Sequence, residues 1–91
     1  MDDNIGFRIN KVRSQLNLSM EKFGNKIGIS KSSVNKLEKG INQPSEQTIK
    51  LICSVYNVDY VWLTQGVGED IFISIPESKI DQIMEDYGLT E

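Results

Sequence analysis

The amino-acid sequence predicts an all-α domain of five short helices, followed by an arm made of a short strand and a helix. Apolar residues recur at intervals of three and four along most of the first 66 residues, as they do on one face of a helix. Serines precede three of these segments and glycines follow three of them, and these residue types respectively begin and end helices. We therefore expect a helical domain over residues 1–66 and an arm over residues 67–91.

The first helix is predicted from four apolar residues, Ile5, Ile9, Val12 and Leu16. Their spacing of four, three and four places them on one face of a helix. Asn17 follows and is the predicted end of this helix.

The second helix is predicted to begin at Ser19, which is a typical N-cap residue, and to end at Gly28. Phe23 and Ile27 share its inner face. Gly24 lies one turn before the bend, where the missing side chain would let the next helix approach closely. The alternative is that Gly24 only weakens the helix, by about 1 kcal/mol relative to alanine.

The third helix is predicted to begin after Ser30 and to end at Gly40, with Val34 and Leu37 facing inward. Only residues 28–30 separate it from the second helix. A turn of that length holds two helices at a steep angle, which is the geometry of a helix-turn-helix.

The fourth helix is predicted to begin at Ser45, and the fifth to follow Asp59 and end at Gly66. The fourth helix has an apolar stripe, and the fifth is anchored by two apolar residues. These residues are Ile49, Ile52, Cys53 and Tyr56 in the fourth helix, and Trp62 and Leu63 in the fifth. We interpret Cys53 and the aromatic residues Tyr56, Tyr60 and Trp62 as core residues.

The composition argues against an enzyme. The chain has no histidine, which is the commonest general base and metal ligand, and its one cysteine lacks a partner base. Gly66-Val67-Gly68 lacks the third glycine of a dinucleotide loop. We therefore expect no cofactor, no metal and no evident small-molecule ligand. The acidic N-terminus, the lone thiol and the absence of a long apolar run favour a cytoplasmic protein with no membrane segment.

The charge of the chain is divided between two regions. The net charge is −3, and the isoelectric point is about 4.9. Residues 8–50 nevertheless hold nine basic and three acidic residues, whereas residues 51–91 hold eight acidic residues and one lysine. Because salt screens charges over about 8–10 Å, the basic region can act separately from the acidic one. A purely structural domain would leave this basic region unexplained.

Several motifs occur in order at fixed spacing, and they give the chain a family resemblance. The matching positions are Arg13, Leu18-Ser19, Gly28-Ile29-Ser30, Glu38, Gly40, Pro44-Ser45, Trp62-Leu63 and Gly66. With these motifs, residues 5–66, about two-thirds of the chain, resemble the lambda-repressor/Cro type of helix-turn-helix regulator, also called the xenobiotic-response-element (XRE) type. The resemblance implies a sequence-specific transcriptional regulator, a repressor that binds a palindromic operator in double-stranded DNA as a dimer.

The resemblance also implies roles for individual residues, with the third helix lying in the major groove of DNA. The base-reading residues would be Lys31, Ser32, Asn35 and Lys36. The phosphate-binding residues would be Ser19, Lys22, Ser33, Lys39, Asn42 and Gln43. The alternative interpretation is a solvated polar helix face, such as most helices have.

An ion pair and one departure from the family pattern also bear on this resemblance. Arg13 and Glu38 would form an ion pair that ties the first helix to the third, the alternative being two unrelated surface charges. Met20 is a departure, because many family members have a phosphate-binding glutamine there and methionine cannot replace it. Lys22 would compensate for that contact.

The arm lies outside the resemblance and carries apolar residues of its own. Residues 71–75 alternate as in a short strand, and Pro76 and Gly88 bound a helical stripe. The arm either folds back on its own domain or pairs with a second copy, and we favour a homodimer. The dimerisation residues would be Ile71, Phe72, Ile73, Ile75, Ile80, Ile83, Met84 and Tyr87.

A second function remains open from the sequence. The chain could be an antitoxin or another protein-interaction module whose acidic C-terminal arm binds a partner protein. A co-purifying partner would favour this function over regulation alone, although an antitoxin can also repress its own operon.

Overall fold

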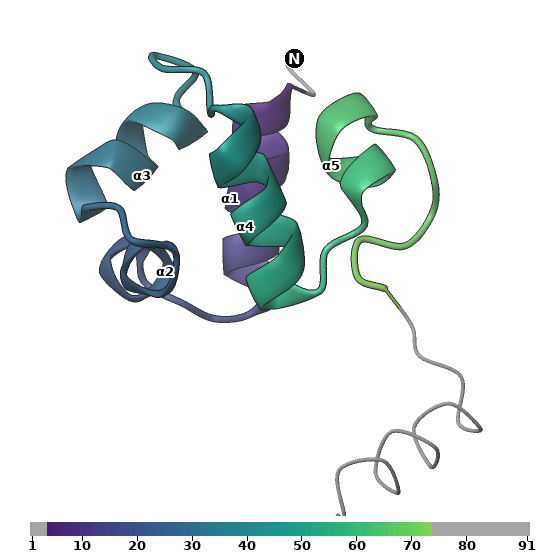
Figure 1. Cartoon of the computed structure of the whole chain (residues 1–91), viewed down its shortest axis with the longest axis horizontal. Helices are drawn as coiled ribbons and strands as arrows, with labels where there is room; N and C mark the ends of the chain where they lie inside the picture. The colour runs from purple at the N-terminus through teal and green to yellow at the C-terminus, as the bar shows by residue number, and fades with distance from the viewer. Residues whose placement is uncertain (1–3, 74–91) are drawn as a thin grey trace, which may run out of the picture.

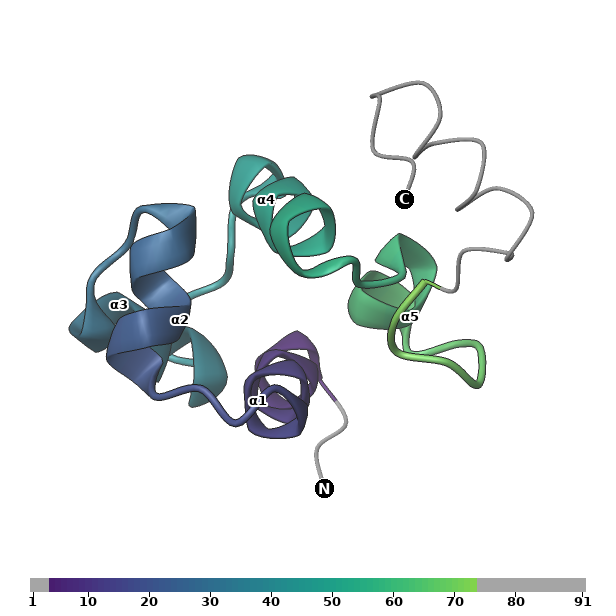
Figure 2. The ribbon, with the colours of Figure 1, turned by 90° about the horizontal axis from the view of Figure 1, so that it is seen from below.

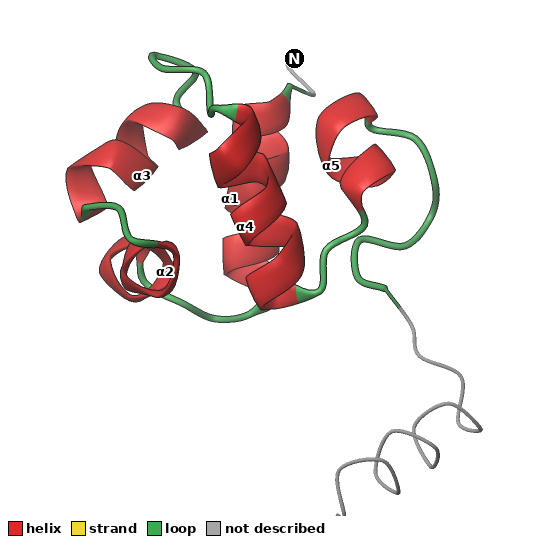
Figure 3. Ribbon diagram, viewed as in Figure 1, coloured by secondary structure: helices red, strands yellow, loops and turns green. Residues whose placement is uncertain are grey.

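The structure is a computed structural model of the chain, and it describes residues 4–73. The prediction of a five-helix, all-α domain is confirmed, and Figure 3 shows no strand in this part of the chain. None of the helices between residues 4 and 73 has the length and apolar character needed to cross a membrane. The helices are α1 (Ile5–Gln15), α2 (Met20–Ile27), α3 (Lys31–Glu38), α4 (Glu46–Tyr56) and α5 (Tyr60–Gln65).

The five helices contact one another in a ring around the core. Helix α3 packs against α1 and α2, and α5 packs against α1 and α4, while α2 and α4 close the ring. In Figure 1 the pair α2 and α3 lies on one side of the molecule and α5 on the other. The view from below in Figure 2 shows α1 and α4 between these two sides. This arrangement leaves the side of α3 that faces away from the ring open to solvent.

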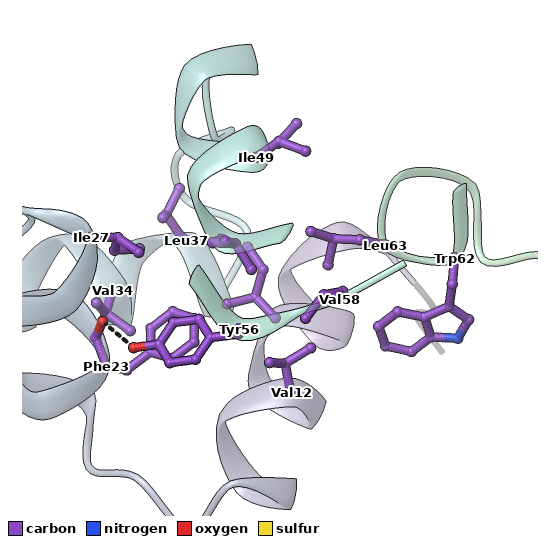
Figure 4. Packing of buried hydrophobic residues seen from close by; sticks show 12 residues of the cluster. Val12, Phe23, Ile27, Val34, Leu37, Ile49, Tyr56, Val58, Trp62 and Leu63 are labelled. Atoms are coloured by element: carbon purple, nitrogen blue, oxygen red, sulfur yellow. Dashed lines mark hydrogen bonds between the residues drawn. The ribbon is translucent and has the colours of Figure 1, made fainter. Parts of the chain in front are cut away.

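The core consists of apolar side chains from all five helices and from Val58 (Figure 4). The rings of Phe23 and Tyr56 stack with centroids 4.8 Å apart. The Tyr56 hydroxyl donates a hydrogen bond of 2.9 Å to the carbonyl oxygen of Phe23, so α2 and α4 are joined by a polar contact as well. The fully buried core residues are Ile9, Val12, Phe23, Val34, Ile52, Val58 and Leu63.

The predicted helix starts are confirmed by their hydrogen bonds. The hydroxyl oxygens of Ser19, Ser30 and Ser45 each accept a hydrogen bond of 3.1–3.2 Å from the backbone N–H three residues later. Gly28 and Gly66, predicted to end α2 and α5, have φ angles of +79° and +73°. Both glycines therefore occupy the left-handed conformation that lets a chain leave a helix. Local sequence chemistry fixes these boundaries.

Two glycines allow α3 to approach its neighbours closely. A Cβ atom added at Gly24 would lie 2.5 Å from the carbonyl oxygen of Ile29 and 2.9 Å from a methyl carbon of Val34. The predicted close approach at Gly24 is therefore confirmed. A Cβ atom at Gly6 would collide with the carbonyl oxygen of Leu37, a contact between α1 and α3 that the sequence did not suggest. No side chain fits at either position without moving α3.

The prediction that Tyr60 belongs to the core is wrong. Its side chain is 40% exposed, and its hydroxyl donates a hydrogen bond of 2.6 Å to the carboxylate of Glu46. Tyr60 is the first residue of α5, and the core-facing side of this short helix is formed by Trp62 and Leu63. Cys53, by contrast, is partly buried and packs against the core, as expected.

The described start of the arm folds back on its own domain. Phe72 forms one isolated antiparallel bridge with Val58. The N–H of Asp59 donates to the carbonyl of Ile71, and the N–H of Ile73 donates to the carbonyl of Asn57, both at 2.8 Å.

This pairing is a single bridge, so the predicted strand over residues 71–75 is not confirmed. Ile71 and Phe72 pack against the core of their own chain, as the fold-back alternative expects for these two positions. Ile73 is 54% exposed. The other proposed dimerisation residues, Ile75, Ile80, Ile83, Met84 and Tyr87, lie outside the described residues.

Candidate nucleic-acid interface

Helix α3 has one face in the core and one face in solvent. Val34 and Leu37 are buried against α1 and α2. Lys31, Ser32 and Lys36 are exposed. The structure thus brings three of the four predicted base-reading residues together on the solvent side of α3.

Asn35, the fourth predicted base-reading residue, is less exposed than Lys31, Ser32 and Lys36. It is partly buried and lines a hollow of about 510 Å³ between α1, the start of α2 and α3. Met20 and Phe7 line the same hollow. Met20 also packs against the core, so the departure seen in the sequence places an apolar side chain beside α3.

The predicted phosphate-binding residues form two groups in the structure. Ser19 caps α2 and Lys22 is exposed one turn later, so both lie at the N-terminus of that helix. The second group follows α3 and contains the exposed residues Lys39, Asn42 and Gln43.

Ser33 belongs to neither group. Its hydroxyl oxygen accepts a hydrogen bond of 3.1 Å from the hydroxyl of Ser30, within the cap of α3. The side chain is partly buried, unlike those of Lys31 and Ser32 beside it. Ser33 therefore has a structural part in the turn between α2 and α3.

Arg13 and Glu38 form the ion pair that the resemblance implies. The guanidinium Nε lies 2.6 Å from Oε2 of Glu38, and Nη2 lies 3.1 Å from Oε1. Arg13 also donates from Nη1 to the carbonyl oxygen of Leu18 at 2.9 Å. The hydrogen bond from Arg13 to Glu38 raises the pKa of the guanidinium above its ordinary value. This pair fixes the C-terminal end of α3 on α1.

Asn10 completes this cluster, and the sequence reasoning missed it. Its side-chain amide donates a hydrogen bond of 2.9 Å to Oε1 of Glu38. Asn10 lies three residues before Arg13 on α1, a spacing that places both on the same face. That spacing was the available signal, but nothing in the sequence indicated the distant partner.

Arg8 does not contribute to the exposed positive charge, although it belongs to the basic region of the sequence. Only 6% of the residue is exposed. Its Nε donates to the carbonyl oxygen of Leu63 at 2.7 Å and its Nη2 to that of Thr64 at 3.2 Å. Arg8 therefore binds the C-terminal end of α5 and ties it to α1. Its position four residues before the core residue Val12 was a signal for this burial.

Comparison with known proteins gives a family and several relatives. The helix-turn-helix family model matches residues 9–63. The antitoxin PezA of Streptococcus pneumoniae serotype 4 is 35% identical over 86 residues, which are 94% of this chain and 48% of that protein. An uncharacterised HTH-type transcriptional regulator of Sinorhizobium medicae is 34% identical over 58 residues, or 64% of this chain and 42% of the other. The chain thus spans less than half the length of these relatives.

Two solved structures share the fold. The P22 c2 repressor, crystallised with the synthetic operator 9T, superposes with a TM-score of 0.67 at 18% identity, covering 72% of this chain and all of the repressor chain. A transcriptional regulator from Listeria innocua gives a TM-score of 0.64 at 9% identity, covering all of this chain and 81% of the other. The fold is therefore that of the lambda-repressor-like domains. Because the family model spans more than half of the sequence, the chain belongs to the XRE-type helix-turn-helix family of DNA-binding transcriptional regulators.

Proposed function

We propose that α3 enters the major groove of an operator and reads its sequence with residues of its exposed face. The observation that carries this proposal is the division of α3, whose apolar side is held by the core while Lys31, Ser32 and Lys36 project into solvent. A helix fits the major groove of B-form DNA, and the second helix of a helix-turn-helix is the one placed there.

The side chains on this face suit particular base edges. Lysine donates to the O6 and N7 acceptors of guanine, serine donates or accepts, and asparagine pairs with adenine. We assign Lys31, Ser32 and Lys36 to direct base contacts and Asn35 to a contact at the edge of the groove. Each good contact of this kind contributes about 1–3 kcal/mol of discrimination between bases.

Phosphate contacts would hold α3 in register. Helix N-termini bind phosphates through their free N–H groups, which favours the start of α2 at Ser19 with Lys22 nearby. Lys39, Asn42 and Gln43 would bind the backbone on the other side of α3. Ser33 would take part by donating its hydroxyl hydrogen to a phosphate oxygen, while its own oxygen accepts from Ser30. Such contacts position the protein without reading the sequence.

We further propose that the protein is a non-enzymatic, cytoplasmic repressor that binds as a homodimer. Two copies related by twofold symmetry would place their α3 helices in half-sites about 34–36 Å apart, one turn of DNA. The exposed Ile73 and the apolar residues of the arm beyond it are the proposed dimer contacts.

Selection of binding sites from random duplex DNA at several salt concentrations tests this function. We expect enrichment of a palindrome with half-sites about 10 base pairs apart. Affinity should fall as salt rises, with a logarithmic slope of about −0.9 for each phosphate neutralised by a lysine. Recovery of no enriched sequence at any salt concentration would contradict the proposal.

The similarity to the antitoxin PezA favours a second candidate function, because the matched region covers 94% of the chain. As an antitoxin, the chain would bind a toxic protein and keep it inactive. The test is to purify the chain from its native cells, identify any protein bound to it and produce that protein alone. We expect the bound protein to stop growth and production of this chain to restore it. An absence of any bound protein, or a bound protein without effect on growth, would contradict this candidate.

A further inference from the structure

The hollow beside α3 is not explained by base reading or phosphate binding. It has a volume of about 510 Å³, and its lining includes Phe7, Met20, Asn35, Glu38 and Lys39. Asn35 and Lys39 belong to the proposed DNA-binding surface, so the hollow would face the same duplex. When DNA is bound, the hollow is therefore occupied either by a group of the DNA or by water.

The walls of the hollow are partly apolar. Phe7 projects from α1 with 43% of its surface exposed, and Met20 lies at the first position of α2. The thioether of methionine is a weak acceptor and has no hydrogen to donate to a phosphate. These two side chains offer van der Waals contact and no charge-assisted hydrogen bond.

The charges around the hollow place phosphates outside it. Glu38 lines the hollow with a carboxylate that accepts hydrogen bonds from Arg13 and Asn10 and is 5% exposed. Positive charge lies nearby on Lys39 and on Lys11, whose ammonium is 5.6 Å from the centroid of the Phe7 ring. A phosphate is therefore favoured beside these lysines and disfavoured next to the carboxylate.

We propose that Phe7 and Met20 pack against a deoxyribose of the operator strand, between two phosphates bound by neighbouring groups. This inference rests on the proposed function and adds two residues to it. Along a DNA strand the sugar is the least polar unit of the backbone, and it lies between consecutive phosphates. The apolar wall formed by Phe7 and Met20, with cationic groups beside it, is therefore complementary to a sugar that lies between two phosphates.

The proposal makes the 2′ position of one sugar important. Deoxyribose presents hydrogen atoms at C2′, whereas ribose presents a hydroxyl that is both donor and acceptor. A hydroxyl pressed against Phe7 and Met20 would lose its water without gaining a partner, which disfavours binding. The hollow would thus favour deoxyribose over ribose at this position.

The first test measures operator binding of the variants Phe7→Ala and Met20→Ala over a range of salt. We expect each substitution to weaken binding about fivefold to tenfold through loss of apolar contact, with the salt slope unchanged. Lys39→Ala should instead reduce the salt slope by about one. Val61→Ala is the matched control, because Val61 is 46% exposed on α5 and belongs to no proposed DNA contact. Equal binding by Phe7→Ala and the wild type would overturn the inference.

The second test substitutes one ribonucleotide at a time through the selected operator. We expect one sugar in each half-site at which ribose weakens wild-type binding and at which Phe7→Ala removes most of that penalty. A penalty of the same size in wild type and variant would overturn the inference. Phe7 is exposed, so this variant is expected to fold even if Met20→Ala does not.

Failure of the inference differs from failure of the proposed function. If the wild type selects no operator, the proposed function fails and the inference falls with it. If the wild type selects an operator and both Phe7→Ala and Met20→Ala bind that operator as tightly as the wild type does, the inference alone is wrong.

Discussion

Replacing Glu38 by alanine is expected to lower the free energy of unfolding by about 3–5 kcal/mol. The substitution removes a carboxylate whose side chain is only 5% exposed and which lies 2.6 Å from the guanidinium of Arg13. Arg13, itself 18% exposed, would keep its charge without this partner. Asn10 would lose its acceptor as well. Such a loss is a large fraction of the stability of a small domain.

Urea denaturation of matched variants measures this effect. Glu21→Ala is the control, because Glu21 is an exposed acidic residue in the first turn of α2, and we expect a loss below about 1 kcal/mol. Glu38→Gln should lie between the two, since an amide keeps the shape and one acceptor oxygen of the carboxylate. If Glu38→Ala were no less stable than Glu21→Ala, the pair would not fix α3 as described.

Replacing both Lys31 and Lys36 by alanine is expected to weaken binding to the selected operator at least about 30-fold. Each lysine is assigned a base contact of about 1–3 kcal/mol, and 1.4 kcal/mol corresponds to a tenfold change in affinity. The side chains are exposed, so the unfolding transition should remain close to that of the wild type. Electrophoretic mobility shift or fluorescence anisotropy measures the affinity.

The double variant Lys26→Ala, Lys50→Ala controls for net charge. It removes the same two charges from exposed positions on α2 and α4 that are assigned no DNA contact. We expect a small, salt-dependent loss of affinity from this control. Equal losses in the two double variants would show that overall charge, and not the face of α3, governs binding.

The sequence predicted the helices well because their ends depend on local chemistry. Ser30 accepts a hydrogen bond from Ser33 three residues along, and Gly28 adopts a left-handed conformation that glycine reaches without steric cost. The buried Val34 and Leu37 and the exposed Lys31, Ser32 and Lys36 of α3 followed from helical spacing, whereas the partial burial of Asn35 did not. The approach of α3 at Gly24 could also be anticipated, because the turn that causes it is adjacent in sequence.

The features that could not be predicted depend on contacts between residues far apart in the chain. The spacing of Arg8 from Val12 is a signal for its burial, but no local pattern indicates its partner, the carbonyl oxygen of Leu63, which lies 55 residues later. Tyr60 is exposed, and the buried residues that anchor α5 are Trp62 and Leu63. The hollow at Phe7 is formed where α1, α2 and α3 come together, and no local sequence pattern predicts that arrangement. Long-range packing thus decided the parts of the candidate interface that the sequence left open.

Methylation interference on the selected operator tests most directly whether α3 lies in the major groove. Guanine N7 is exposed in that groove and adenine N3 in the minor groove. We expect methylation of particular guanines to block wild-type binding, and single variants at Lys31 or Lys36 to lose sensitivity each at its own guanine. Interference confined to adenine N3, with guanine methylation tolerated throughout the half-sites, would contradict the placement of α3.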